Sequence, residues 1–216
     1  MLLRWKIAQW FELQWWKRYL SGKSKEEYVA WKANYWLQLM RTLELEKTIA
    51  NAQSIVDFGC GPFGLPLANQ QWKKELTAVD PLLDEYAATI PFFNKKDYPE
   101  THFVTKSIED FSSSITYNIV FCMNAINHVH AIDKAFDVVV NSAQQNSTIV
   151  VSIDAHNFSF FKFLFRLIPG DILHPHQYDL KEYSSFLERR NCAIEKTVCI
   201  KKEFFFDHYV LVARKL

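Results

Sequence analysis

The chain has 216 residues, a formal net charge of +1, 49% hydrophobic residues and 23% charged residues. This length supports one domain with a full hydrophobic core, and the composition is that of a soluble globular protein. A nearly neutral chain has no general attraction to nucleic acid or to anionic lipid. No run approaches the roughly 20 apolar residues needed to cross a bilayer, and the charged N-terminus does not resemble a secretory signal. We therefore expect a cytoplasmic protein.

The first fifty residues have the apolar spacing of two helices. Apolar residues recur at every third or fourth position over 3–20, and Ser21-Gly22 interrupts the pattern. Ser24, followed three residues later by Glu27, has the signature of a capping box that begins a second helix. That helix is apolar over a wide arc, so it is expected to pack against two neighbours.

From residue 54 onward, short apolar runs alternate with segments that resemble helices. The predicted strands are 54–58, 76–80, 102–105, 118–123, 148–153, 193–201 and 205–213, and the predicted helices between them are 65–72, 82–89, 133–145 and 180–190. This alternation favours a parallel α/β sheet covered on both faces. The last two runs have no helix-length segment between them, so they should pair as an antiparallel hairpin. A phenylalanine-rich stretch, 157–168, is predicted to form an inserted helix over the ligand-binding end of the sheet.

Three of the five glycines, Gly59, Gly61 and Gly64, lie within six residues directly after the first strand. A chain this sparing with glycine places it where the backbone needs positive φ or a close approach. A strand that ends in G-x-G-x-x-G and opens a helix lets a ligand lie against bare main chain beside the helix N-terminus. Residues 55–64 are therefore the expected floor of a nucleotide-type cofactor site.

Two aspartates strengthen this interpretation. Asp57 precedes the first glycine of the turn at the carboxyl end of its strand, and Asp80 closes the second strand about twenty residues later, where an acid can accept both hydroxyls of a ribose. Either carboxylate alone could be a capping or turn residue. Together with the glycines they indicate a nucleotide site, although a G-x-G-x-x-G with a downstream acid also suits an NAD(P)-binding oxidoreductase.

The string 56–64, Val-Asp-Phe-Gly-Cys-Gly-Pro-Phe-Gly, resembles motif I of class I S-adenosylmethionine-dependent methyltransferases. The resemblance extends through Asp80, 107–111 and 118–129 to the closing hairpin, and covers roughly residues 50–216. It implies a Rossmann-like seven-stranded α/β sheet of order 3-2-1-4-5-7-6 with the last strand antiparallel, and S-adenosyl-L-methionine as the cofactor.

The resemblance also assigns the residues of the glycine turn. Gly59 and Gly61, with Cys60 between them, would lie against the methionine and ribose parts of the cofactor. Asp57 would orient the methionine ammonium, usually through water. Asp80, followed by Pro81, would hold the ribose hydroxyls.

Further contacts are implied after the third and fourth strands. Ile108 occupies the position whose backbone amide commonly meets the adenine, and Asn124 faces the methionine end. Many relatives carry Asp where this chain has Ser107, so the usual carboxylate contact to the adenine amino group is in question. Glu109 is a substitute for it, and the other interpretation of Glu109 is a solvated turn residue.

Histidines are the candidate bases, because the ordinary pKa of histidine lies near physiological pH and a hydroxyl nucleophile needs a base. His128 follows the fourth strand, and His176 lies in the loop before the helix at 180–190; both segments face the acceptor in relatives. A structural role in fixing the loop is the alternative for His128. His174 and His176 resemble a two-ligand metal arm, but no Cys or acid cluster nearby completes a site, so no metal is predicted.

In this family the N-terminal helices and the 157–168 segment form variable substrate lids, so residues 1–50 are expected to be a helical cap and 51–216 the cofactor-binding methyltransferase domain. Their Trp and Phe content suggests a small, apolar or aromatic acceptor, methylated on oxygen or nitrogen. A homodimer face and peripheral membrane contact are alternative uses of these aromatic residues. A non-catalytic binding subunit with the same fold is the rival that the retained pocket residues cannot by themselves exclude.

Overall fold

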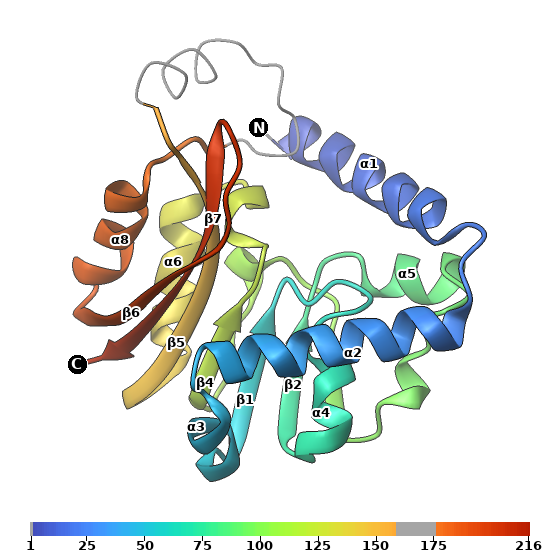
Figure 1. Cartoon of the computed structure of the whole chain (residues 1–216), viewed down its shortest axis with the longest axis horizontal. Coiled ribbons are helices and arrows are strands. Elements are labelled where there is room, and N and C mark those ends of the chain that lie inside the picture. The colour runs from blue at the N-terminus through green and yellow to red at the C-terminus, as the bar shows by residue number, and fades with distance from the viewer. Residues whose placement is uncertain (1, 159–175) are drawn as a thin grey trace.

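The computed structural model describes residues 2–158 and 176–216. A seven-stranded sheet of order β3-β2-β1-β4-β5-β7-β6 forms its centre (Figure 1). The strands are β1 (Ser54–Phe58), β2 (Glu75–Val79), β3 (Thr101–Val104), β4 (Tyr117–Cys122), β5 (Ala143–His156), β6 (Cys192–Lys201) and β7 (Phe206–Lys215). β7 is antiparallel to both β5 and β6, and the other pairs are parallel. The predicted strand order and the closing hairpin are confirmed.

Helices connect and flank these strands. They are α1 (Leu2–Leu20), α2 (Lys25–Thr42), α3 (Glu46–Asn51), α4 (Pro66–Trp72), α5 (Leu83–Thr89), α6 (Ile132–Asn141) and α8 (Leu180–Glu188), with the short 3-10 turns η1 (Lys95–Asp97), η2 (Ile108–Asp110) and η3 (Ile126–His128). The predicted helix 133–145 is wrong at its end, because Ala143 already pairs with Tyr117 in the β4–β5 ladder. Of the predicted inserted helix 157–168, residues 159–168 lie outside the described residues.

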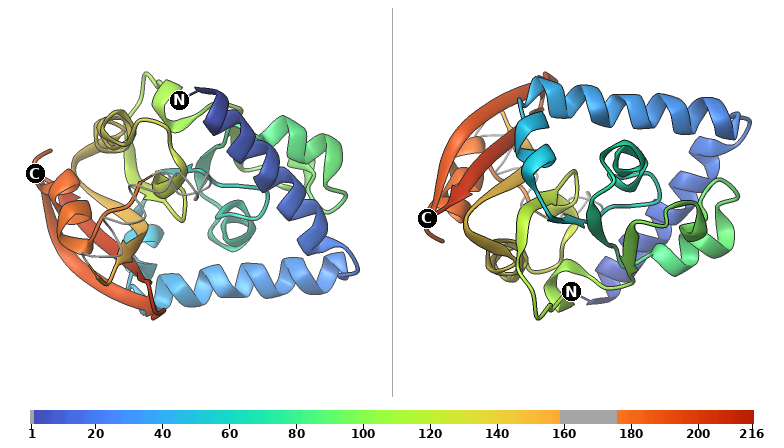
Figure 2. Two further views of the ribbon diagram at one scale, coloured as in Figure 1. Left: turned by 90° about the horizontal axis from the view of Figure 1, so that it is seen from above. Right: turned by 90° about the horizontal axis from the view of Figure 1, so that it is seen from below.

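Each face of the sheet has its own apolar core. Successive residues of β1 illustrate the alternation: Ile55 packs into the core formed with α2, α3, α4 and α5, whereas Val56 packs into the core formed with α6 and α8. Both side chains are fully buried. Figure 2 shows α2 along one side of the sheet and α6 on the other. This double cover explains why the parallel strands are apolar on both faces.

The two N-terminal helices meet the rest of the protein differently. α2 is part of the main core, where Trp36 and Met40 are buried with β1 and β2, and the Trp36 indole N–H donates to the Phe63 carbonyl at 2.8 Å. α1 crosses the carboxyl ends of the strands (Figure 1), and its Glu12 accepts a hydrogen bond from the Tyr86 hydroxyl at 2.8 Å. α1 therefore covers the edge of the sheet where open α/β folds bind ligands.

Candidate functional site

Two adjoining cavities lie at the carboxyl ends of the parallel strands. The smaller cavity, of about 80 Å³, and the larger cavity, of about 680 Å³, share the walls formed by Glu12, Gly59 and Asn124. The smaller cavity alone is well below the roughly 300–1,000 Å³ of ligand sites, whereas the two together are ample. Residues of the smaller cavity include Trp5, Gln9, Asp80, Pro81, Ser107, Ile108 and His128. Residues of the larger cavity include Trp16, Lys32, Tyr35, Trp36, Cys60, Gly61, Phe63, Asp154 and His208.

The turn after β1 presents bare main chain. Gly59 and Gly61 have left-handed φ angles of 66° and 54°, which residues with a side chain rarely adopt. A Cβ on Gly59 would lie 2.1 Å from the Cβ of Ala125, so the turn is tightly packed there. A Cβ on Gly61 would meet nothing within 4 Å, and Gly61 borders the larger cavity. The turn therefore leaves room for a ligand against the main chain of Gly61.

Asp80 follows β2 and holds the same turn. Its Oδ2 accepts a hydrogen bond from the N–H of Gly61 at 2.9 Å, and its Oδ1 accepts one from the N–H of Leu82 at 2.8 Å. Burial, followed by the negative charge of Glu12, raises the pKa of Asp80. Because Asp80 also borders the smaller cavity, further donors such as a pair of hydroxyls can reach its carboxylate from there.

Asp57, the other aspartate that the sequence assigned to the cofactor site, lies beneath the turn. It is 1% exposed and lines neither cavity. Its Oδ2 accepts a hydrogen bond from the N–H of Leu65 at 3.0 Å, and a Cβ on Gly64 would approach that oxygen to 2.8 Å. Burial raises the pKa of Asp57 to about 7, against the lowering effect of the Leu65 N–H. Asp57 therefore supports the turn from below and does not face the open space.

The loop after β3 contributes the next wall. Ile108 begins η2, and the Ser107 hydroxyl caps that turn by accepting from the N–H of Asp110 at 3.2 Å. The solvated-turn interpretation of Glu109 is wrong, because Glu109 is 3% exposed. Its Oε1 accepts from the N–H of His130 at 2.8 Å and lies 2.8 Å from the ring nitrogen Nδ1 of His130. Glu109 thus ties η2 to the loop after β4.

That loop carries Asn124 and His128. Asn124 has a left-handed φ of 55°, which asparagine tolerates better than most residues, and its N–H donates to the hydroxyl of Ser152 at 2.5 Å. Asn124 borders both cavities, and His128 borders the smaller one. His176 lines neither cavity; its Nε2 lies 2.7 Å from the carbonyl of Val129, and burial lowers its pKa. Thus Asp80, Asn124 and His128 meet at one cavity, and His176 lies apart from it.

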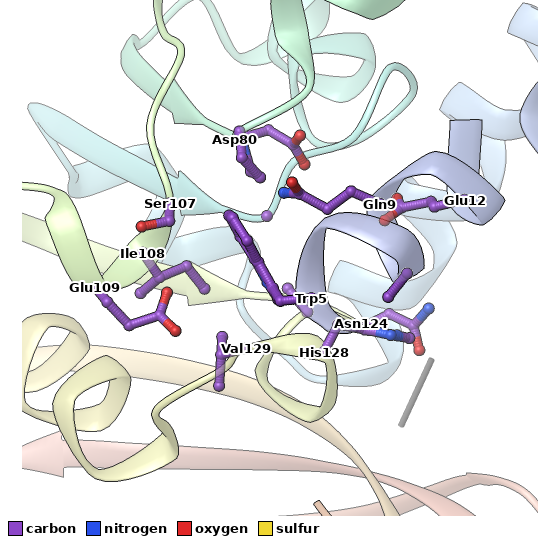
Figure 3. A pocket seen from close by; sticks show the side chains of 14 residues that line it. Trp5, Gln9, Glu12, Asp80, Ser107, Ile108, Glu109, Asn124, His128 and Val129 are labelled. Atoms are coloured by element: carbon purple, nitrogen blue, oxygen red, sulfur yellow. The ribbon is translucent and has the colours of Figure 1, made fainter. Parts of the chain in front are cut away.

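Four residues of α1 line the smaller cavity, Trp5, Ala8, Gln9 and Glu12, and none of them was predicted individually. Figure 3 shows Trp5, Gln9 and Glu12 projecting toward Asp80 and Ile108. The side-chain amide nitrogen of Gln9 is buried, with no hydrogen-bond partner among the described residues. A buried donor of this kind is costly unless a ligand or water meets it. The helical spacing of 3–20 predicted the helix, but nothing in the sequence indicated which of its residues face the sheet.

All four cysteines, Cys60, Cys122, Cys192 and Cys199, are free thiols. Within residues 2–158 and 176–216, no three His, Cys, Asp or Glu side chains cluster so as to hold a metal ion. In the same part of the chain, no helix combines the length and apolar character that membrane crossing requires.

The strand order, the glycine turn and the acid after β2 together define the Rossmann-like fold of class I S-adenosylmethionine-dependent methyltransferases. Solved structures agree, each below 25% identity. They include an N-methyltransferase, NodS, from Bradyrhizobium japonicum WM9 in complex with S-adenosyl-L-homocysteine (TM-score 0.58, 11% identity, 91% of this chain and 90% of that chain). An O-methyltransferase family protein from Burkholderia thailandensis gives a TM-score of 0.65 at 10% identity, over 90% of this chain and 60% of that chain. The resemblance seen in the sequence is confirmed at the level of the fold.

Sequence comparison with curated proteins gives a match below 30% identity. A ubiquinone biosynthesis O-methyltransferase of Rickettsia typhi is 24% identical over 153 residues, which are 69% of this chain and 60% of that protein. The match thus spans about three fifths of the length of this curated relative. No protein-family model matches the chain.

Proposed function

We propose that this protein is an S-adenosylmethionine-dependent methyltransferase that acts on an oxygen or nitrogen atom of a small, fairly apolar acceptor. The observation that carries the proposal is the meeting of Gly61, Asp80 and Asn124, from the ends of three parallel strands, around adjoining cavities. The shared fold with methyltransferases, among them one solved with S-adenosyl-L-homocysteine, supports it. The antiparallel β7 within the order β3-β2-β1-β4-β5-β7-β6 favours a methyltransferase over an NAD(P)-binding oxidoreductase.

The residues present suit such a cofactor. The empty Cβ position of Gly61 leaves main chain open to a methionine or ribose group. The carboxylate of Asp80 would accept from the ribose hydroxyls, with Pro81 beside it, and the unmatched amide of Gln9 is a donor on the opposite wall. Ser107 and Ile108 would border the adenine, Asn124 and Cys60 the methionine end. Asp57 would support the turn from below without facing the cofactor.

When bound, the cofactor supplies a methyl group already activated by its sulfonium sulfur. The protein's task is then to align an acceptor atom with the methyl–sulfur bond and to exclude water. In this proposal α1 is the lid, since it closes both cavities from above through Glu12. The aromatic side chains of Trp16, Trp36 and Phe63 in the larger cavity would accommodate an apolar or aromatic acceptor. His128 is a candidate to fix or deprotonate the reacting groups.

Calorimetry with S-adenosyl-L-homocysteine tests the proposal. Wild type should bind it and should not bind NADH. Asp80→Asn should bind it about 10- to 100-fold more weakly, since hydrogen bonds to a charged group contribute about 1.5–3 kcal/mol. Glu75→Gln is the matched control, because Glu75 is exposed at the opposite end of the same strand, and its affinity should equal that of wild type. Wild-type affinity in Asp80→Asn would remove Asp80 from the site, and failure of wild type to bind would overturn the proposal.

A further inference from the structure

A histidine and an aspartate face each other at the far wall of the larger cavity. Asp154 of β5 and His208 of β7 are direct partners in the antiparallel ladder, so their side chains leave the same face of the sheet. Ser152 lies two residues before Asp154 on β5 and shares that face. All three residues border the larger cavity. The hairpin that closes the sheet thus brings a histidine and a carboxylate to the proposed acceptor space.

The two sides of the His208 ring differ in their contacts. Nδ1 contacts the carboxylate of Asp154, which fixes the ring and favours the tautomer with the proton on Nδ1. Nε2 is buried without a hydrogen-bond partner among the described residues. The nearest acid is the carboxylate of Glu203, whose Oε2 lies 3.7 Å from Nε2, too far for a hydrogen bond. A buried nitrogen that lacks a partner and carries a lone pair in this tautomer is suited to accept a proton from a ligand.

The dyad is connected to the cofactor side of the site. The hydroxyl of Ser152 accepts the N–H of Asn124 at 2.5 Å, and Asn124 borders both cavities. Two residues along a strand span roughly 7 Å, so Asp154 is about that far beyond the Asn124 loop. An acceptor in the larger cavity can therefore present one atom toward the glycine turn while its proton faces His208.

We propose that His208, oriented by Asp154, is the catalytic base for a phenolic hydroxyl acceptor bound in the larger cavity. This inference rests on the proposed methyltransferase function. As the oxygen–methyl bond forms and the methyl–sulfur bond breaks, Nε2 takes the hydroxyl proton. The products are a methyl ether, neutral S-adenosyl-L-homocysteine and an imidazolium. The positive charge of the sulfonium thus passes to a ring flanked by the carboxylates of Asp154 and Glu203.

Both the walls and the acidity favour a phenol. Trp16, Tyr35 and Trp36 line the cavity with aromatic surface that fits a flat ring. A phenol releases its proton near pH 10 in water, far closer to the range of an imidazole base than an aliphatic alcohol does. The other charges on the cavity wall are Glu12 from α1, Lys32 from α2 and Lys201 from β6, of which Lys201 pairs with Glu203.

The test uses 4-nitrophenol as the probe, because its ionised form is yellow. The full chain is titrated with it, with and without S-adenosyl-L-homocysteine, about one pH unit below the pKa of the free phenol. Wild type should bind the probe and ionise it, whereas His208→Gln should bind it without the colour change. Asp154→Asn should lose most of the change while keeping the imidazole. His102→Gln, at an exposed position on the distant strand β3, is the control and should behave as wild type.

Two further readouts make the result decisive. Nitrogen NMR of the His208 ring should find the proton on Nδ1 in wild type and a mixture of tautomers in Asp154→Asn; a proton on Nε2 in wild type would overturn the inference. So would equal ionisation by wild type and His208→Gln, or failure of wild type to bind the probe. S-adenosyl-L-homocysteine affinity should stay within about twofold in both dyad variants. Failure of wild type to bind S-adenosyl-L-homocysteine would instead count against the proposed function. The failure of this inference and the failure of the proposed function can therefore be distinguished.

Discussion

The carboxylate of Asp80 accepts a hydrogen bond from the N–H of Gly61 at 2.9 Å, across nineteen residues of sequence. This contact joins the end of β2 to the glycine turn after β1. The turn is therefore held from one side by Asp80 and from below by Asp57, which accepts from Leu65 at 3.0 Å. The two acids differ in their surroundings: Asp80 borders the smaller cavity, whereas Asp57 is buried beneath the glycine turn.

Gly61→Ala should lower both the folding stability, through the backbone, and the affinity for the ligand, through the added Cβ. The left-handed φ of 54° makes alanine cost about 1–2 kcal/mol of folding free energy, yet the new Cβ meets nothing within 4 Å in the free protein. With S-adenosyl-L-homocysteine present, the same Cβ would occupy the space of the ligand, so we expect at least a tenfold loss of affinity by calorimetry.

Gly22→Ala is the matched control for this change. Gly22, between α1 and α2, has a φ of 78° and equally open surroundings, so alanine there should cost similar stability and leave affinity unchanged. Equal affinities for the two variants would place the ligand away from the glycine turn.

Asp57 should make the free protein less stable as the pH rises. Its pKa is raised to about 7 by burial, whereas an unfolded aspartate titrates near 3.9. The folded state therefore holds the proton more tightly, and this contribution is fully present below about pH 4 and is lost as the pH rises toward about 7. In Asp57→Asn, the fall in the free energy of unfolding between about pH 5 and 8, measured by urea unfolding, should be smaller than in wild type by roughly 1 kcal/mol or more. An unchanged slope in the variant would show that Asp57 titrates normally.

Much of this architecture could be predicted from the sequence, because it depends on local signals. The apolar runs gave six strands nearly to the residue, and the concentration of glycine at 59–64 located the turn. β5 was underestimated, since its polar start, Ala143–Ser147, has no strand-like pattern and is extended through pairing with β4 that begins at Tyr117.

The site could be predicted only in part, for a related reason. Asp80, Ser107, Ile108 and Asn124 lie within four residues of a strand's end, so their position at the sheet edge is set by the strand itself. His208 and Asp154 face the cavity only because β5 and β7 pair in one register, and a register of antiparallel strands far apart in sequence cannot be read from either strand alone. The burial of Glu109 likewise depends on donors twenty-one and twenty-two residues away.

Trp36→Phe should destabilise the protein at the glycine turn, because it removes the hydrogen bond to the carbonyl of Phe63. The indole N–H donates to the Phe63 carbonyl at 2.8 Å in a buried position, so phenylalanine would leave that carbonyl unsatisfied at a cost of about 1–3 kcal/mol. Urea unfolding should show this loss. Trp31→Phe, on the same helix and 55% exposed, should cost less than about 0.5 kcal/mol. Equal losses in the two variants would mean that the hydrogen bond contributes nothing beyond ring packing.

Trp5 should control entry to the smaller cavity. Its ring projects between Asp80 and Ile108 (Figure 3), and the remaining cavity of about 80 Å³ is too small for an adenosyl group. In the proposed function, binding of the adenosyl group would require Trp5 to move, and the association rate would be reduced by the fraction of time that the ring blocks the space. Trp5→Ala should bind S-adenosyl-L-homocysteine roughly threefold faster or more by stopped-flow fluorescence. Trp10→Ala, on the same helix but 56% exposed, should keep the wild-type rate. Slower association in Trp5→Ala would instead show that the indole assists entry by stacking on the ligand.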